Sequence, residues 1–163
     1  MTNKKSKSFL VGGASFLALL FLSWWVTFPL LTFEINEKLY WTTEKNFTLK
    51  WIHSVEKEEW IEFYEKKEKT ILLTTTAFKT FGAGVPSTPK DGQHVTVKDG
   101  YVTMDINRSF PSLELIVSEN VKSTLVIKEK EILLYALAGD YEPVTISVQP
   151  ISLWDMLLKG ESL

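Results

Sequence analysis

Two histidines, His53 and His94, are the side chains of this sequence best suited to proton transfer near neutral pH. His53 lies in the run Trp-Ile-His-Ser-Val-Glu-Lys, and a regular strand would place His53 and Ser54 on opposite faces. The pair is therefore not arranged as a nucleophile and its base. Three roles stay open for His53: a partly buried ring with a backbone or carboxylate partner, a ligand contact, or a catalytic base.

The sequence contains no motif typical of a metal, cofactor or phosphate site. The two histidines lack the HxH or HxxxH spacing of a zinc site, and the acidic residues lack the spacing of a calcium loop. Gly82–Pro86 lacks the lysine of a phosphate-binding loop, so Gly82 and Gly84 are turn residues or line a pocket. The absence of cysteine excludes disulfides, thiol catalysis and Cys-ligated zinc. We therefore predict no catalytic residue, metal or cofactor.

A binding site becomes plausible if the chain turns at the charged run Glu56–Glu59. Antiparallel pairing across that turn would place Glu62 beside His53, where a carboxylate favours the imidazolium and raises the pKa of the ring. The Gly82–Pro86 loop would add backbone N–H groups, which suits an anionic ligand or a partner loop. The predicted ligand- or partner-binding residues are His53, Ser54, Glu56, Glu62, Gly82, Gly84 and Pro86.

The amino-terminal part of the chain has the pattern of a membrane anchor. Residues 1–8 hold Lys4, Lys5 and Lys7, and residues 9–33 contain no charge. An apolar helix of about 20 residues spans a hydrocarbon core, and the positive-inside rule keeps the lysines in the cytoplasm. We expect a single-pass protein of the cell membrane with a cytoplasmic basic tail (1–8), a signal anchor in the lipid bilayer (9–33) and an extracytoplasmic domain (34–163). A cleaved signal peptide and a buried core helix are the alternatives.

The remainder of the chain is acidic, because it keeps all 20 acidic residues and loses three lysines. A nucleic-acid partner is therefore not expected, since phosphate binding needs clustered Lys and Arg.

The elements that would position these residues alternate with period two, which is typical of strands. Asp99-Gly100 separates two such runs and predicts a hairpin with a type I′ turn. We favour a strand over a helix for the residues after the charged turn, because Trp60, Ile61 and Phe63 are aromatic or β-branched. Further strands are expected at residues 47–51, 70–78, 113–117, 124–128, 131–137 and 144–148, a long connection at 81–92 and a short helix at Ser152–Lys159. The fold class is all-β, with one sandwich- or barrel-like domain.

Three short motifs in this order resemble an uncharacterised bacterial family, a domain of unknown function often encoded beside TAXI-type TRAP solute transporters. They are His53-Ser54-Val55-Glu56, then Glu62 two residues before Tyr64, then Gly82-Ala83-Gly84-Val85-Pro86. The similarity covers roughly residues 45 to 150. It implies an exported, membrane-tethered β domain, and it implies a TRAP-type permease or its solute-binding protein as partner through gene neighbourhood alone.

Two functional classes follow. The first is a membrane-anchored accessory or ligand-binding protein, which needs only a pocket. The second is a tethered hydrolase or isomerase, which needs His53, a carboxylate and an oxyanion donor around one cavity. The small number of suitable polar residues favours the first class.

Overall fold

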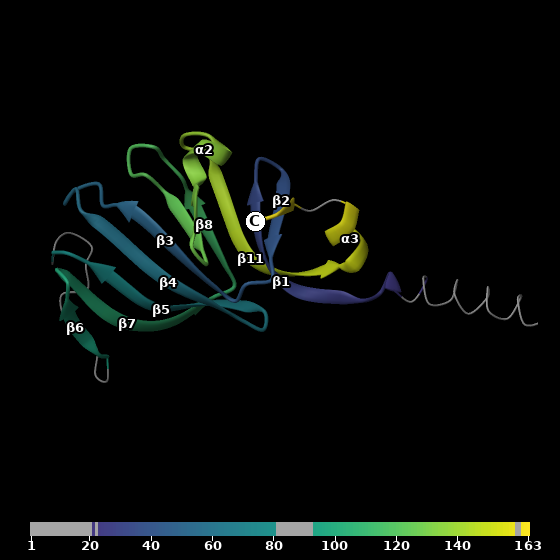
Figure 1. Ribbon diagram of the computed structural model, residues 1–163, viewed down its shortest axis with the longest axis horizontal. Coiled ribbons are helices and arrows are strands. Elements are labelled where there is room, and N and C mark those ends of the chain that lie inside the picture. The colour runs from purple at the N-terminus through teal and green to yellow at the C-terminus, as the bar shows by residue number, and fades with distance from the viewer. Residues whose placement is uncertain (1–20, 22, 81–92, 159–160) are drawn as a thin grey trace, which may run out of the picture.

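The computed structural model describes residues 21, 23–80, 93–158 and 161–163, and this part of the chain is mainly β-structure. One sheet has five strands in the order β12-β2-β1-β11-β8, and the other has seven in the order β10-β9-β3-β4-β5-β7-β6 (Figure 1). Buried side chains of both sheets form a common core, so the prediction of an all-β domain is confirmed in its sandwich-like form.

The elements have the following bounds. The five-stranded sheet contains β1 (Thr27–Ile35), β2 (Lys38–Thr42), β8 (Ser112–Ile116), β11 (Pro143–Ser152) and β12 (Glu161–Ser162). The seven-stranded sheet contains β3 (Asn46–Ile52), β4 (Glu59–Lys67), β5 (Thr70–Phe78), β6 (Val95–Lys98), β7 (Tyr101–Phe110), β9 (Thr124–Ile127) and β10 (Lys130–Leu133). Two short helices are α2 (Leu134–Ala138) and α3 (Leu153–Leu158).

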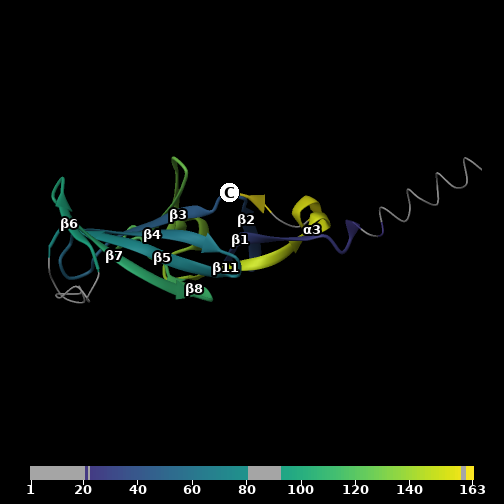
Figure 2. The ribbon, with the colours of Figure 1, turned by 90° about the horizontal axis from the view of Figure 1, so that it is seen from below.

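The core explains why these runs form strands. On β1, Leu31, Phe33 and Ile35 alternate with period two and are fully buried. Phe47 and Leu49 of β3 face them from the other sheet, and the rings of Phe33 and Phe47 meet edge to face at 6.1 Å. The seven-stranded sheet continues past this core to the end of the molecule that carries β6 (Figures 1 and 2).

Strand β1 begins before residue 34, where the sequence predicts the start of the domain. We assigned residues 27–33 to the membrane anchor, but they form a central strand paired with both β2 and β11. The sequence hides this strand because Leu30 and Leu31 are adjacent and both buried, and because the run continues the apolar segment before it. The residues before Thr27 are those left for the predicted anchor, and residues 1–20 lie outside the described part. Within the described residues, no helix is long and apolar enough to cross a membrane.

The predicted hairpin is confirmed. β6 and β7 pair directly across Asp99 and Gly100, whose φ angles of 53° and 79° fit the two central positions of a type I′ turn. The strand predicted after the charged turn is also confirmed as β4.

Two helical details complete the fold. The strand predicted at 131–137 ends at Leu133, and α2 follows, because Leu134 and Ala138 lie one turn apart and are both buried. The predicted C-terminal helix is confirmed as α3. It is capped by Ser152, whose Oγ accepts the Asp155 N–H at 3.0 Å.

Candidate functional site

His53 holds the turn between β3 and β4. Its ring Nδ1 accepts the backbone N–H of Glu56 at 3.3 Å, and the backbone N–H of His53 donates to the Glu58 carbonyl at 2.8 Å. The ring stacks on Trp60 with centroids 5.6 Å apart. One ring nitrogen is thus engaged with the backbone, which is a structural use of this histidine.

The predicted site residues do not all meet. Glu62 pairs with Leu49 in the β3–β4 register, whereas His53 lies beyond the end of β3, which pairs Ile52 with Glu59. His53 and Glu56 border a small depression, and Glu62 borders a different cavity with no lining residue in common. Ser54 is exposed in the turn. Gly82, Gly84 and Pro86, with the rest of the predicted connection at 81–92, lie outside the described residues.

A cavity of about 270 Å³ lies between the two sheets, beside Glu62. The seven-stranded sheet contributes Leu49, Trp51 and Glu62, and strand β8 contributes Leu115 together with the adjoining Val117. Ligand sites in proteins are typically concave and combine a mainly apolar lining with some polar groups, and seven of the twelve residues that line this cavity are apolar. The remaining lining residues are Lys50, Glu114, Ile116, Val121, Ser123, Thr124 and Leu134.

Glu62 is the partly buried carboxylate of this cavity. Strand alternation places it on the inward face with Trp60 and Tyr64, two residues away on either side. The Tyr64 hydroxyl donates a hydrogen bond to Glu62 Oε2. Burial raises the pKa of the Glu62 carboxyl above its ordinary value, and the Tyr64 hydroxyl and Trp60 indole oppose that shift.

The aromatic rings around Glu62 stack in two pairs. Trp51 and Trp60 are cross-strand partners whose rings stack at 6.0 Å, and Phe47 and Tyr64 stack at 4.9 Å. Burial also raises the pKa of Tyr64, and the neighbouring Glu62 charge raises it further, so the phenol stays protonated as a donor. The carboxylate therefore has a fixed orientation between aromatic surfaces.

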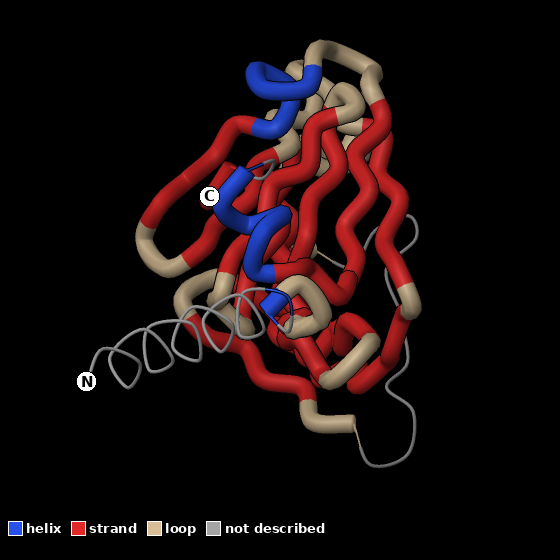
Figure 3. The backbone as a smooth tube through the Cα atoms, turned by 90° about the vertical axis from the view of Figure 1, so that its right-hand side faces the viewer, coloured by secondary structure: helices blue, strands red, loops and turns tan. Residues whose placement is uncertain are grey.

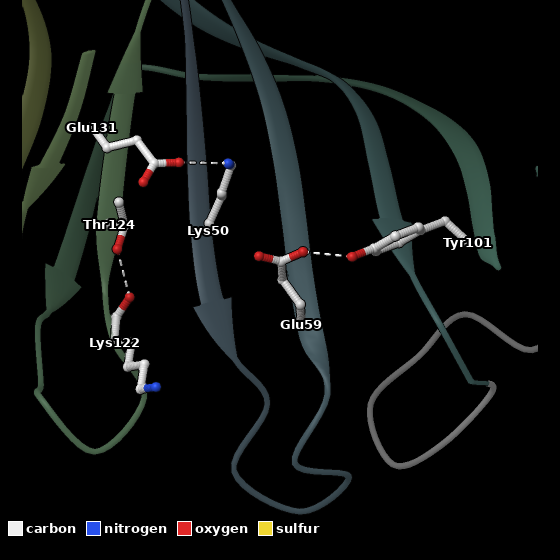
Figure 4. Close-up of polar contacts among 6 residues, drawn as sticks. All are labelled: Lys50, Glu59, Tyr101, Lys122, Thr124 and Glu131. Atoms are coloured by element: carbon white, nitrogen blue, oxygen red, sulfur yellow. Dashed lines mark hydrogen bonds and ion pairs between the residues drawn. The ribbon is translucent and has the colours of Figure 1, made fainter. Parts of the chain in front are cut away.

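The cationic side chains of this region are directed elsewhere. Lys50 alternates to the outer face of β3, where its Nζ pairs with Glu131 at 2.9 Å (Figure 4). On the same face Tyr101 donates to Glu59 at 2.5 Å. Among the described residues, Glu62 forms no ion pair within 4.0 Å. The inward carboxylate thus has a phenol and an indole beside it, and no lysine or arginine of the described residues pairs with it.

The same region offers no metal centre. Across the described ranges, no group of three or more His, Cys, Asp or Glu side chains is arranged to hold an ion.

The sequence identified Glu62 and the Glu-x-Tyr spacing but not the other wall of the cavity. Leu115 and Val117 follow Glu62 by more than 50 positions and come from the other sheet. Their inward orientation depends on how the two sheets pack, and a single sequence carries no signal for that packing. The pairing of Trp51 with Trp60 could have been predicted from the sequence, because the two residues flank the charged turn at matching positions of a hairpin.

Comparison with protein families gives one match, which covers residues 47–134 and is described as a domain of unknown function, DUF1850. The matched region runs from the start of β3 to the start of α2 and so contains Glu62 and most of the cavity lining. Neither the curated proteins nor the solved structures gave a match.

Proposed function

We propose that this chain, which belongs to the DUF1850 family of domains of unknown function, is a membrane-tethered extracytoplasmic protein that binds a small cationic ligand between its sheets. The observation that carries the proposal is the inward Glu62 carboxylate, which borders a cavity of about 270 Å³ and forms no ion pair with any described residue. Lys50 also lines this cavity, but its Nζ pairs with Glu131. The transmembrane anchor and the extracytoplasmic location are supported by the lysines before an uncharged run.

A cation suits this cavity for two reasons. A carboxylate withdrawn from water is destabilised, and a positive group placed against it recovers the lost electrostatic stabilisation. The faces of aromatic rings attract cations as well, and Trp51 lines the same cavity. The volume limits the occupant to a small molecule such as an organic amine with a compact apolar part.

The anionic ligand that the sequence suggested required His53 as an imidazolium beside Glu62. The two residues border different depressions, and the His53 Nδ1 accepts a backbone N–H. Glu62 and Glu114 both line the cavity, and the lining residue Lys50 is paired with Glu131, so the ligand proposed here has the opposite sign.

Binding fits the geometry better than bond breaking. The hydroxyls that line the cavity are engaged with the backbone: Ser123 Oγ accepts the Ser118 N–H at 3.2 Å, and Thr124 Oγ1 donates to the Lys122 carbonyl at 2.8 Å. Among the residues that the structure describes, neither hydroxyl is hydrogen-bonded to a base that would make it a nucleophile. A tethered hydrolase or isomerase built on His53 therefore draws no support from this arrangement.

The partner proposed for the anchored domain is a TRAP-type permease or its solute-binding protein. This part of the proposal rests on the resemblance described from the sequence. A small-molecule site on a domain beside a permease would let the protein respond to, or deliver, a transported solute.

The test uses benzylammonium as a cationic probe and benzyl alcohol as its neutral counterpart. Thermal unfolding of the full-length chain in detergent micelles should shift upward with benzylammonium, because a ligand that binds the folded state stabilises it. Glu62→Gln should abolish the shift, and Glu65→Gln should retain it, since Glu65 lies on the same strand but pairs with Lys67. Equal shifts with both probes, or a shift that survives Glu62→Gln, would refute cation recognition at this site.

A further inference from the structure

Large apolar side chains are exposed together at the end of the domain where the described chain begins. They come from two segments more than 120 residues apart, the entry to β1 and the helix α3. Trp25 is 77% exposed and Leu158 72%. We call this group the terminal patch, and its members are Phe21, Trp24, Trp25, Val26, Phe28, Leu153, Leu157 and Leu158.

The two segments are fixed to each other. The Trp154 indole donates a hydrogen bond to Ser23 Oγ at 3.2 Å, and its ring lies 5.8 Å from the ring of Trp24. The Leu153 N–H donates to the Val26 carbonyl at 3.3 Å. Figure 3 looks onto this end of the molecule and shows α3 facing the viewer. The terminal patch is thus one surface built from both segments.

Helix α3 presents its apolar side to the outside. Leu153 and Leu157 are four residues apart and share one face, and Leu158 adjoins it. Asp155 is the single acidic residue of the helix, and its carboxylate accepts the Ser152 hydroxyl at 2.7 Å. Exposed apolar clusters of this kind mark interaction surfaces, since water disfavours them.

The surroundings of the terminal patch identify its partner. The sequence has no charged residue between Lys7 and Glu34, so the patch continues directly into the proposed anchor. Tryptophan is enriched where membranes meet water, and apolar helix faces bury there. Lys66 reaches the border of the patch, donating to the Pro29 carbonyl at 2.6 Å, a position from which a lysine can also meet lipid phosphate.

We propose that the terminal patch rests in the headgroup layer of the bilayer, so that α3 forms a second membrane contact beside the anchor. The inference rests on the tether in the proposed function, because the anchor brings the patch to the lipid. The anchor and α3 together fix the orientation of the domain relative to the membrane, whereas the anchor alone would leave the domain free to rotate. The β6–β7 hairpin, at the opposite end of the molecule, then lies farthest from the membrane (Figures 1 and 2).

The chain has no cysteine, so a single substitution gives one labelled site. Leu157→Cys in the patch and Val97→Cys in the hairpin are matched controls, because the two native side chains are 69% and 75% exposed. Each full-length variant carries an environment-sensitive fluorophore and is reconstituted into phosphatidylcholine–phosphatidylglycerol vesicles with brominated acyl chains. Compared with vesicles of unbrominated lipid, the fluorescence of the label at position 157 should fall about twofold or more, because apolar helix faces bury among the acyl chains. The fluorescence of the label at position 97 should not change.

The possible results of this experiment distinguish a failure of the α3 membrane contact from a failure of the membrane anchor. Co-flotation with vesicles while the label at 157 escapes quenching would overturn the membrane contact of α3 and leave the anchor intact. Failure to co-float would overturn the tether and the inference together. Ready formation of a disulfide-linked dimer by unlabelled Leu157→Cys, together with a labelled chain that brominated lipid does not quench, would assign the terminal patch to a second copy of the chain and would also overturn the inference.

Discussion

The role proposed for Glu62 depends on the residues around it. A glutamate in a strand usually faces water, but the inward register with Leu49 places this one among Trp51, Trp60 and Tyr64. Perturbed carboxyl groups bordering cavities are candidates for function. Tyr64 then orients the carboxylate, and the cavity leaves room for a cation in front of it.

The raised pKa of Glu62 makes a prediction about pH and stability. Protonation is favoured in the folded state, so the stability contributed by this group is present below the ordinary value of 4.5 and is lost as pH rises through the folded-state pKa. Glu62→Gln stays neutral and should melt at a higher temperature than the native chain at pH 7. Each unit between the two pKa values corresponds to about 1.4 kcal/mol.

Melting curves measured from pH 3 to pH 8 check this expectation. The two chains should converge toward the acidic end, where both are neutral at position 62. Glu65→Gln serves as the control for removing a carboxylate from the outer face. A native chain that gains stability over Glu62→Gln as pH rises would show that the carboxylate is stabilised in the folded state. A difference independent of pH would show that folding leaves the pKa of this carboxyl unshifted, which also contradicts the prediction.

Part of the site was predictable from the residues themselves. Glu62 and Tyr64 are two positions apart, which on a strand guarantees a common face. The convergence of Glu62 with His53 failed because the β3–β4 turn is longer than a tight hairpin and places Glu58 opposite His53. Which carboxylate turns inward depended on register, and register is fixed by pairing across the whole hairpin.

At the scale of elements, alternation was readable where one face of a strand meets water. β3, β5 and the β6–β7 hairpin follow from such patterns and from the Asp99-Gly100 turn. β1 was hidden, because Leu30, Leu31, Thr32 and Phe33 are all buried and the run merges with the apolar segment before it. α2 was hidden as well, since a five-residue helix shows only one i, i+4 pair.

The turn prediction is that Gly100→Val destabilises the domain through backbone strain alone. Gly100 has a φ of 79°, and an added Cβ would meet no atom within 4 Å, so no clash contributes. A β-branched residue in this conformation should lower the free energy of unfolding by about 1–3 kcal/mol. Gly100→Asn should be nearly neutral, because asparagine tolerates this region. Chemical denaturation of the three chains measures the difference, and equal losses for Val and Asn would argue against strain as the cause.

The position of β1 predicts where a shortened chain can begin. A chain starting at Glu34 loses Leu31 and Phe33, which are fully buried in a central strand. Each large buried side chain contributes about 2–5 kcal/mol, against a total domain stability of about 5–15 kcal/mol. Residues 34–163 should therefore fail to fold, whereas residues 23–163 should give a β-type circular dichroism spectrum with a cooperative transition. A cooperative transition in the shorter chain would show that β1 is dispensable.

The whole molecule has two distinct ends. The terminal patch and α3 lie at one end and the β6–β7 hairpin at the other, with the cavity between the sheets (Figure 1). A membrane contact at the first end would leave the cavity accessible from the aqueous side. Tethering and ligand binding would then use separate surfaces of the domain.

The proposed topology predicts the behaviour of the chain in intact cells. Protease added after removal of the wall should digest the domain, while an epitope fused before Lys4 should be degraded only after the membrane is opened. The physical reason is the retention of Lys4, Lys5 and Lys7 on the cytoplasmic side. A mature protein that starts near residue 30 and is released from cells would contradict a permanent anchor.

Cation recognition by Glu62 is tested most directly by the pKa of its own carboxyl group. The measurement is a pH titration of the Glu62 side-chain carboxyl carbon by nuclear magnetic resonance, on the full-length chain with and without benzylammonium. In the free chain the pKa should lie above 4.5, as burial dictates. Saturating benzylammonium should lower it, because a positive charge against the carboxylate favours the ionised form, and benzyl alcohol should not. An identical Glu62 pKa with and without benzylammonium would contradict the proposed site.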